Sequence, residues 1–404
     1  MSMAHAKRDP SDFRSIKASV LHGAKDLRIE TRYVAPPAAS ELQVAVRSTG
    51  LCGSDLHYYQ HYRNGNIVVR EPMSLGHESA GVVVKVGSSV QNFNVGDKVA
   101  LEVGLPCGIC ERCREGRYNI CKEMKFRSSA KAFPHAQGTL QERINHPAEW
   151  CYKLPEDMSL DTGTLLEPLG VAIHGNDRAA LERLSTVLVF GAGAVGLLVA
   201  AVSKISGAGT VLIADIDAGR VDFAVRNGFA HHGYAVPMKR GNTIDEDLEI
   251  AQETAANIGE VSRRNGRPVG EVDTVFECTG VPSCLQAAIY ATRPGGKVIL
   301  IGMGHAVQTL PISAAALREV DLIGSFRYAN TYPKGIEILS RTGPDYPRFA
   351  DIITHRFYGF NTLDQAFQMA GRTKDDDGKL VIKVVVELDE DGDLSRSSQH
   401  QIAV

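Results

Sequence analysis

Four cysteines lie within a run of fifteen residues, at positions Cys107, Cys110, Cys113 and Cys121. Four thiolates at this spacing can surround one tetrahedral zinc ion and leave no coordination position open for a substrate. In a chain of 404 residues, clustered cysteines indicate a metal site rather than a disulfide framework. We therefore predict a structural zinc site here, in preference to four unrelated buried cysteines.

A second set of candidate ligands is dispersed along the chain and comprises Cys52, the adjacent pair His77 and Glu78, and Glu167. No single member is diagnostic, because a histidine beside a glutamate is usually an ordinary structural pair. Together they offer a thiolate, an imidazole and carboxylates. Such a mixed set suits a zinc ion that keeps one position open for water or a substrate, which is what catalysis requires.

A glycine-rich turn follows the apolar run VLVF, with glycines at Gly191, Gly193 and Gly196. The first glycine permits a tight turn, the second lets a pyrophosphate approach the backbone, and the third allows a helix to pack closely on the strand. The amino end of that helix then faces the phosphates, and Val195 is expected over the dinucleotide. By itself, the pattern also fits a purely structural strand-to-helix turn.

Asp215 strengthens the dinucleotide interpretation, because it ends the next apolar run, TVLIAD, 19 residues beyond Gly196. A carboxylate there can accept hydrogen bonds from the adenosine ribose hydroxyls. Its charge would repel the 2′-phosphate of NADP, and the neighbouring Ile216 offers no donor, so NAD is favoured. Arg220 is a competing signal for a phosphate, although it fits better as a cation over the adenine ring.

The elements that must position these residues fall into two patterns. Residues 17–103 form short β-branched runs broken by Gly, Pro and Asp, which predicts a β-rich, barrel-like region. From about Leu184 the chain alternates strands and helices, which predicts a doubly wound parallel sheet and an α/β fold class. We expect this sheet to be complete by Phe326, with a helix at 334–341 and a late strand at 380–388. The predicted domains are therefore 1–169 with 327–404, and 170–326.

Composition sets limits on function. The formal net charge is −3, with 44% hydrophobic and 23% charged residues, which argues against nucleic acid as a partner. The first fifteen residues lack the apolar core of a secretory signal, and no apolar run approaches the roughly 20 residues of a membrane span. We expect no membrane partner and a cytoplasmic protein. The polar tail 389–404 is expected to fray, and 239–270 reads as a surface insertion with a helix.

These motifs resemble those of the zinc-containing medium-chain dehydrogenases, in particular the branch acting on sorbitol, xylitol and arabinitol. The resemblance spans roughly Lys17 to Leu388 and is carried by LCGSDLHYY, GHESAGVVVKVG, the four cysteines, LLEPLGVAIHG, GAGAVG and REVDLIGSFRYANTYP. It implies a GroES-like β-rich catalytic domain and a Rossmann NAD-binding domain. Tetramers are common in this family, so a homotetramer is expected.

The resemblance also implies residue roles. Cys52, His77 and Glu78 would hold a catalytic zinc ion, with Glu167 close by, either as a direct ligand or through water. Ser54, His57 and Glu167 would take part in catalysis, the first two by passing the alcohol proton to solvent. Tyr58, Glu167, Arg327 and Tyr328 would line a polyol pocket. The cofactor residues would be Gly191, Gly193, Val195, Gly196, Asp215, Arg220, Ile301, Gly302, Met303, Ser325, Phe326 and Arg327.

Two features favour a polyol over a simple alcohol. Simple alcohol dehydrogenases of the family use a second cysteine at the zinc and have a more apolar pocket, whereas this chain has Glu78 and the donors of Arg327 and two tyrosines. We predict a dehydrogenase with two zinc ions per chain that oxidises a secondary hydroxyl of sorbitol or xylitol to the ketose and reduces NAD. An L-arabinitol 4-dehydrogenase stays open because some sorbitol enzymes lack the four cysteines. A threonine-type dehydrogenase is a weaker alternative, and a zinc-binding, nucleotide-sensing regulatory protein is the non-enzyme alternative.

Overall fold

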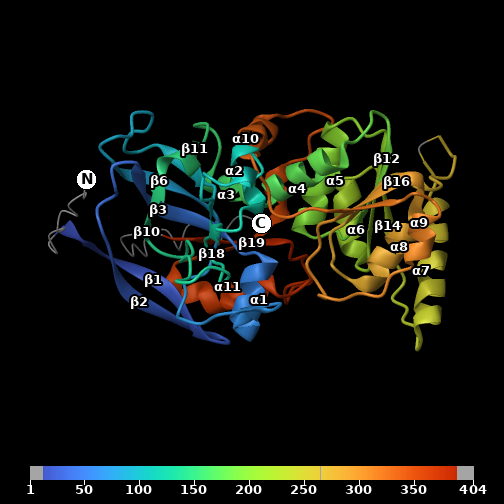
Figure 1. Cartoon of the computed structure of the whole chain (residues 1–404), viewed down its shortest axis with the longest axis horizontal. Helices are drawn as coiled ribbons and strands as arrows, with labels where there is room; N and C mark the ends of the chain where they lie inside the picture. The colour runs from blue at the N-terminus through green and yellow to red at the C-terminus, as the bar shows by residue number, and fades with distance from the viewer. Residues whose placement is uncertain (1–11, 264, 389–404) are drawn as a thin grey trace. The chain divides into compact units, whose positions relative to one another are not determined.

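The structure is a computed structural model that describes residues 12–263 and 265–388, and the tail expected to fray therefore lies outside it. The chain divides into two compact units, each described separately here. The first takes the residues up to Glu167 and those from Ile353 onward, and the second runs from Pro168 to Ile352. Figure 1 labels many of the elements of both units. Within the described ranges, no helix combines the length and apolarity that crossing a membrane demands.

Short strands make up most of the first unit. Its elements are β1 (Arg14–Gly23), β2 (Asp26–Val34), β3 (Glu41–Gly50), α1 (Gly53–His61), β4 (Arg63–Asn64), β5 (Ile67–Val68), β6 (Glu78–Val86), β7 (Lys98–Leu101), β8 (Gly104–Leu105), α2 (Glu111–Arg114), η2 (Tyr118–Ile120), β9 (Lys125–Phe126), β10 (Arg143–Pro147), η3 (Ala148–Trp150), β11 (Cys151–Lys153), α3 (Leu160–Thr164), β18 (Ile353–Tyr358), η5 (Phe360–Thr362), α11 (Leu363–Ala370) and β19 (Lys383–Glu387).

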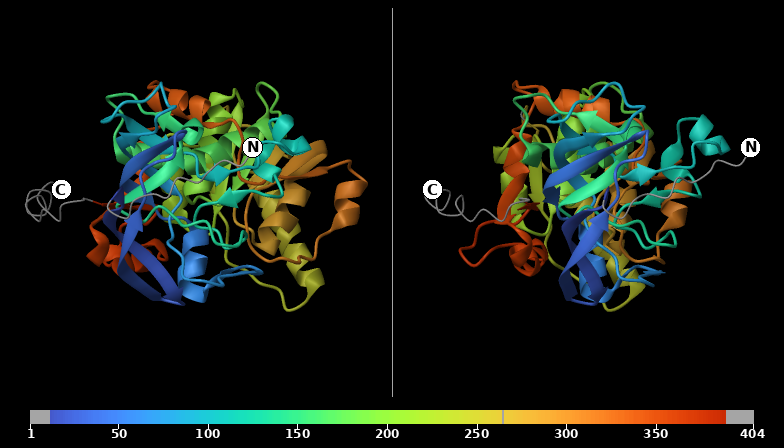
Figure 2. Two further views of the ribbon diagram at one scale, coloured as in Figure 1. Left: turned by 60° about the vertical axis from the view of Figure 1, so that its left-hand side comes forward. Right: turned by 90° about the vertical axis from the view of Figure 1, so that its left-hand side faces the viewer.

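Strand β3 is the centre of this unit. Its apolar stretch LQVAV is buried, and the strand pairs with β6, β10 and β19 in a seven-stranded sheet whose main order is β11-β7-β6-β3-β19-β18. The β1–β2 hairpin, dark blue in Figures 1 and 2, forms a separate ribbon that reaches the rest of the unit through the bridge Ala18↔Gln141. The late strand returns to the first unit as predicted, because β19 pairs antiparallel with β3.

The second unit alternates strands and helices. Its elements are α4 (Leu166–Ala179), which begins at the division, β12 (Thr186–Phe190), α5 (Ala194–Ile205), β13 (Thr210–Asp215), α6 (Ala218–Arg226), β14 (His232–Ala235), α7 (Ile244–Gly259), β15 (Val272–Glu277), α8 (Pro282–Ala291), β16 (Thr292–Leu300), α9 (Ile312–Ala316), β17 (Asp321–Gly324), α10 (Tyr332–Ser340) and η4 (Phe349–Ile352).

The predicted parallel, doubly wound sheet is confirmed. Six strands run in the order β14-β13-β12-β15-β16-β17, and every pairing between them is parallel. The order reverses at β12, whose five residues are all buried, as expected for a strand covered on both faces. Helices α5 and α6 lie on one side of the sheet, and α7 to α9 lie on the other (Figure 1). The α/β fold class follows from this arrangement.

Two features of the second unit differ from expectation. Segment 327–352, which we expected in the first domain, belongs to the second unit. It packs there because Gly170 of α4 leaves room for Tyr328 and Thr331, and because Lys334 pairs with Asp177 at 3.0 Å. In addition, segment 239–270, which was predicted as a surface insertion with a helix, contributes to the hydrophobic core. Its helix α7 buries Ala251, Ala255 and Ile258 in an apolar cluster with residues of the parallel sheet.

Candidate zinc and dinucleotide sites

The dispersed ligand candidates converge in the first unit. The ligand atoms of Cys52, His77 and Glu78 all lie within 4.8 Å of one another. Glu78 is the first residue of β6 and pairs opposite Gly50 at the end of β3, and the chain then turns so that Cys52 caps the start of α1. Both His77 and Glu78 are buried. The register of two adjacent strands thus brings residues 25 positions apart into one cluster.

Asp55 orients the imidazole of His77. The Nδ1 atom of His77 lies 3.2 Å from Asp55 Oδ1, which also accepts hydrogen bonds from the Ser128 hydroxyl at 2.6 Å and the Gly76 amide at 3.1 Å. A carboxylate that holds one ring nitrogen of a histidine leaves the other nitrogen available for a metal. The geometry therefore directs Nε2 of His77 into the cluster, where the Ser54 hydroxyl lies 3.5 Å from it.

The electrostatics of this cluster favour a cation. Burial alone would lower the pKa of His77, yet the negative charges of Asp55 and Cys52 raise that pKa well above its ordinary value. Burial would likewise raise the pKa of Asp55, but the histidine and the hydrogen bonds from Ser128 and Gly76 hold that pKa below its ordinary value. Surroundings that stabilise a proton on a buried imidazole also stabilise a divalent ion beside it.

Glu78 has a partner that the sequence did not reveal. Both carboxylate oxygens lie 2.7 Å from the Nζ atom of Lys383, which also donates to the Leu51 carbonyl at 3.1 Å. Burial would lower the pKa of Lys383, but the charges of Glu78 and Cys52 raise it above its ordinary value. Each carboxylate oxygen has a second lone pair, so the ion pair still leaves Glu78 able to bind a metal. A Cβ atom at Gly50 would lie 2.3 Å from Glu78 Oε2, so a side chain at that position would displace this carboxylate.

The other residues predicted for this site, Glu167, His57 and Tyr58, are not part of the ligand cluster. Glu167 is buried and outside the ligand cluster, but its charge helps to raise the pKa of Lys383, so it lies near the cluster. His57 is exposed on α1. Tyr58 is 2% exposed, and its hydroxyl accepts a hydrogen bond from the Ala130 amide at 3.2 Å. That contact gives Tyr58 a place in the core, and its contact with a substrate stays a prediction.

The four clustered cysteines form a compact ligand set around α2. All four sulfur atoms lie within 4.8 Å of one another, including Cys110 and Cys113 at 3.5 Å. Hydrogen bonds from the amides of Ile109 and Cys110 lower the pKa of Cys107 to about 6. Since the thiolate is the form that binds metal, these backbone donors prepare Cys107 for zinc. The cluster fits the closed coordination expected of a structural site.

The glycine turn lies where a dinucleotide site would require it, at the carboxyl end of β12 and the start of α5. Gly191 has a φ of 99°, which favours glycine. A Cβ atom at Gly196 would lie 1.8 Å from the Gly191 carbonyl oxygen, so no other residue fits there. Gly193 caps α5, and the nearest atom to a Cβ there would be Arg220 Nη1 at 3.8 Å. The turn therefore exposes open backbone for a phosphate, with Val195 in the first turn of the helix.

Asp215 lies directly beside this turn. Its Oδ2 atom accepts a hydrogen bond from the Ala192 amide at 2.7 Å, and its Oδ1 atom accepts one from the Asp217 amide at 2.9 Å. The carboxylate is thus fixed at the end of β13, the strand adjacent to β12. The next residue, Ile216, is 60% exposed. Its apolar side chain offers no positive charge that could bind a 2′-phosphate at this position.

The other predicted cofactor and substrate residues follow β16 and β17. The amides of Ile301 and Gly302 both donate to the Glu277 carbonyl, Met303 is 61% exposed, and the Ser325 amide donates to Leu300. Past these strands, the Arg327 guanidinium lies 4.9 Å from the centre of the Phe326 ring. Tyr328 is buried, with its ring 5.9 Å from that of Tyr332.

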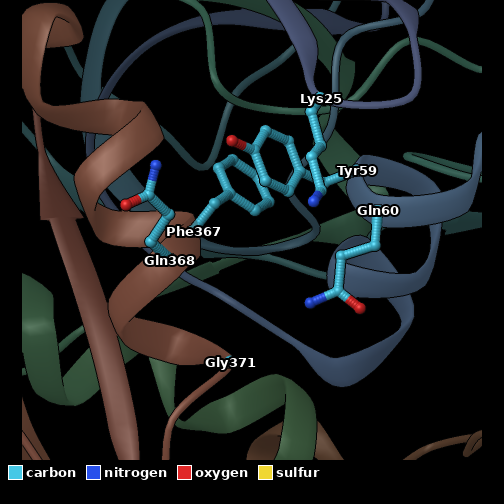
Figure 3. Close-up of a pocket in the computed structure, with 6 residues that line it drawn as sticks. All are labelled: Lys25, Tyr59, Gln60, Phe367, Gln368 and Gly371. Carbon is cyan, nitrogen blue, oxygen red and sulfur yellow. The ribbon is translucent and has the colours of Figure 1, made fainter.

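One cavity of about 280 Å³ in the first unit is lined by none of the predicted site residues (Figure 3). Its floor is the stacked pair of rings of Tyr59 from α1 and Phe367 from α11, with centroids 4.7 Å apart. The Tyr59 hydroxyl donates to Asp364 at 3.0 Å. The remaining lining residues are Lys25, Gln60, Gln368 and Gly371. None is a metal-ligand candidate, so we assign no chemistry to this cavity.

Comparison with known proteins decides the family. Residues 38–156 match the model of the alcohol dehydrogenase GroES-like domain, and residues 194–341 match that of the zinc-binding dehydrogenases. A sorbitol dehydrogenase of Gallus gallus is 39% identical over 372 residues, which cover 92% of this chain and 96% of the relative. The chain belongs to the zinc-containing medium-chain dehydrogenases, in their polyol branch.

Other relatives of this medium-chain dehydrogenase carry a second name. An L-idonate 5-dehydrogenase of Vitis vinifera is 36% identical over 372 residues, covering 92% of this chain and 94% of the relative. The crystal structure of L-idonate 5-dehydrogenase from Escherichia coli is 26% identical, with a TM-score of 0.77 over 93% of this chain and 99% of that one. The family and the enzyme class expected from the sequence are confirmed, as are the GroES-like and Rossmann folds.

Sequence reasoning about this dehydrogenase missed two residues that contact the ligand cluster. Asp55 had a local signal, because it is the third residue of a helix that begins at Gly53, and a carboxylate is favoured in the first turn of a helix. Lys383 had no such signal, since 305 positions separate it from Glu78. Both residues fit a bound zinc ion: Asp55 orients the imidazole, and Lys383 holds the carboxylate.

Proposed function

We propose that this dehydrogenase oxidises a secondary hydroxyl of sorbitol or xylitol to the ketose and passes the hydride to NAD. The observation that carries the proposal is the cluster of Cys52, His77 and Glu78, in which the histidine and the glutamate are buried, in a chain that also has the glycine turn and Asp215. A bound zinc ion would act as a Lewis acid that polarises the alcohol oxygen, and NAD would accept the hydride. Two zinc ions per chain are expected, the second at the four cysteines.

The protein residues supply orientation and proton transfer. Asp55 holds Nδ1 of His77 and would leave Nε2 to hold the zinc ion, and Lys383 keeps Glu78 in place. The hydroxyl of Ser54, 3.5 Å from His77 Nε2, would accept the alcohol proton while it gives its own proton to the exposed His57 one turn further along α1, and His57 would release that proton to solvent. Arg327, Tyr58 and Tyr328 would bind the other hydroxyls of the polyol, with Glu167 near the metal.

The choice of substrate rests on a panel of alcohols. NADH formation is measured with sorbitol, xylitol, L-arabinitol, ribitol, L-idonate and threonine, and zinc is measured by mass spectrometry. We expect the highest kcat/KM with sorbitol or xylitol and two zinc ions per chain. A preference for L-arabinitol or L-idonate would reassign the substrate, and an absence of turnover with every polyol would reject the proposal. Membership of a dehydrogenase family removes the support for a purely regulatory nucleotide sensor.

Cofactor choice is tested by changing two adjacent residues. In Asp215→Ala/Ile216→Arg, the carboxylate that repels a 2′-phosphate is lost, and a basic side chain enters at an exposed position. We expect the ratio of kcat/KM for NADP to that for NAD to rise at least about tenfold, which is about 1.4 kcal/mol. Asp222→Asn, which removes an exposed carboxylate on α6, is the matched control. An unchanged ratio in the double variant would reject the ribose-binding role of Asp215.

We further propose a cytoplasmic homotetramer. All eight cysteines are free, and metal-binding thiols require a reducing compartment. Strand β17 ends the six-stranded sheet, and exposed apolar side chains at Val307, Ile312 and Leu317 lie in the segment that precedes it in the chain. Such a surface is typical of contacts between subunits. Sedimentation equilibrium should give the mass of four chains of 43.7 kDa each.

A further inference from the structure

A second cavity lies at the opposite end of the parallel sheet from the glycine turn. Its volume is about 240 Å³. Thr210 and His232, the first residues of β13 and β14, are part of its wall, so it lies at the amino ends of these strands. Among the described residues, those that line it are Gly209, Thr210, His231, His232, Arg263 and Asn265.

The side chains around this cavity mostly donate hydrogen bonds. They are one guanidinium, two imidazoles, one amide and one hydroxyl, and the described lining includes no carboxylate. The Nδ1 atom of His231 accepts a hydrogen bond from the Val211 amide at 2.9 Å. In its neutral form the ring must therefore carry its proton on Nε2 and act there as a donor. A cluster of donors without an acid is complementary to an anion.

Arg263 is held in place while part of its donor capacity is unused. Its Nη2 atom donates to the Val269 carbonyl at 2.8 Å and to the Thr186 hydroxyl at 3.3 Å. Its Nε atom is buried and has no hydrogen-bond partner among the described residues. A buried N–H group without a partner costs stability, so a ligand that accepted from it would be favoured. We infer that this cavity binds the phosphate group of a small phosphate monoester.

The position separates this site from the dinucleotide site. Thr210 and Asp215 are at opposite ends of β13, which a strand rise of about 3.3 Å per residue places about 17 Å apart. Dinucleotides bind at the carboxyl ends of parallel strands. The cavity volume corresponds to about eight water molecules at about 30 Å³ each, which leaves room for an organic group beyond a single phosphate.

The test is isothermal titration with glycerol 3-phosphate in the presence of saturating NADH, so that the pyrophosphate site is filled. We expect one glycerol 3-phosphate to bind per chain, glycerol not to bind, and inorganic phosphate to compete more weakly. Competition by inorganic phosphate of equal strength would show that free phosphate, not a monoester, is the ligand and would overturn the choice of a monoester. No heat with either phosphate compound would overturn the site itself.

Asn265→Asp is the decisive variant. The substitution keeps the side-chain shape and the oxygen that accepts from the Arg267 amide at 3.1 Å, but it adds a negative charge to the cavity. We expect binding of glycerol 3-phosphate to weaken at least about tenfold. Arg226→Gln, which removes an exposed cation of the same unit paired with Asp222, should leave binding unchanged. Equal affinity of Asn265→Asp and the unmodified protein would place the ligand elsewhere. This readout needs no turnover, so it is independent of the proposed dehydrogenase activity.

Discussion

Cys52→Ala is expected to abolish polyol oxidation while NADH still binds. The substitution removes the only thiolate of the ligand cluster formed with His77 and Glu78, and a zinc ion lost from that cluster can no longer polarise the alcohol. We expect kcat/KM to fall at least about a thousandfold, which is about 4 kcal/mol of transition-state stabilisation. The glycine turn and Asp215 belong to the other unit, so a fluorescence titration should give an NADH affinity close to that of the unmodified protein.

Cys151→Ala is the matched control for this prediction. Cys151 is another cysteine of the first unit, 5% exposed, and it belongs to neither of the two groups of candidate metal ligands found among the described residues. We expect Cys151→Ala to keep its full zinc content and Cys52→Ala to lose one zinc ion per chain. If Cys52→Ala retained near-normal turnover, the catalytic zinc assignment would be wrong. His77→Ala should behave as Cys52→Ala does.

The parts of the site that were predictable are those whose residues are close in sequence. The four cysteines, within fifteen positions, can reach one ion without any knowledge of the fold. The glycine turn is equally local, because Gly196 must contact the Gly191 carbonyl five residues earlier. The parallel sheet follows from the alternation of strands and helices, although the four-residue strands β14 and β17 are too short to give a periodic signal.

The parts that escaped prediction depend on contacts between distant segments. A helix such as α10 shows from its sequence that one face is apolar, but not which core will cover it. Tyr332 is buried, and the ion pair of Lys334 with Asp177 joins residues 157 positions apart. We therefore expected residues 327–352 in the wrong unit. For the same reason, nothing in the segment GKLVIKVVVEL indicated that its second lysine, Lys383, is the partner of a metal ligand.

Lys383→Met is expected to destabilise the zinc-free first unit by about 3–5 kcal/mol. Lys383 and Glu78 have side chains only 5% and 1% exposed, so the substitution leaves a buried carboxylate without its counter-charge. Breaking a buried ion pair by removing one partner costs this much, whereas replacing both partners is often neutral. The chain has one tryptophan, Trp150, in the first unit. Urea unfolding followed by its fluorescence therefore reports on the unit that contains the pair.

The double variant Lys383→Met/Glu78→Gln separates loss of the ion pair from loss of packing. If the cost of Lys383→Met is an unpaired negative charge, neutralising Glu78 should restore most of the stability of the zinc-free protein. An equal loss of stability in both variants would instead attribute the effect to the methylene chain of the lysine.

Zinc binding provides a second test of the same ion pair. A divalent ion beside Glu78 would supply the missing positive charge. Lys383→Met should therefore lower the free energy of unfolding less in the zinc-loaded protein than in the zinc-free one. Equal costs in the two forms would mean that Glu78 does not face the metal, and the ligand set would then reduce to Cys52 and His77.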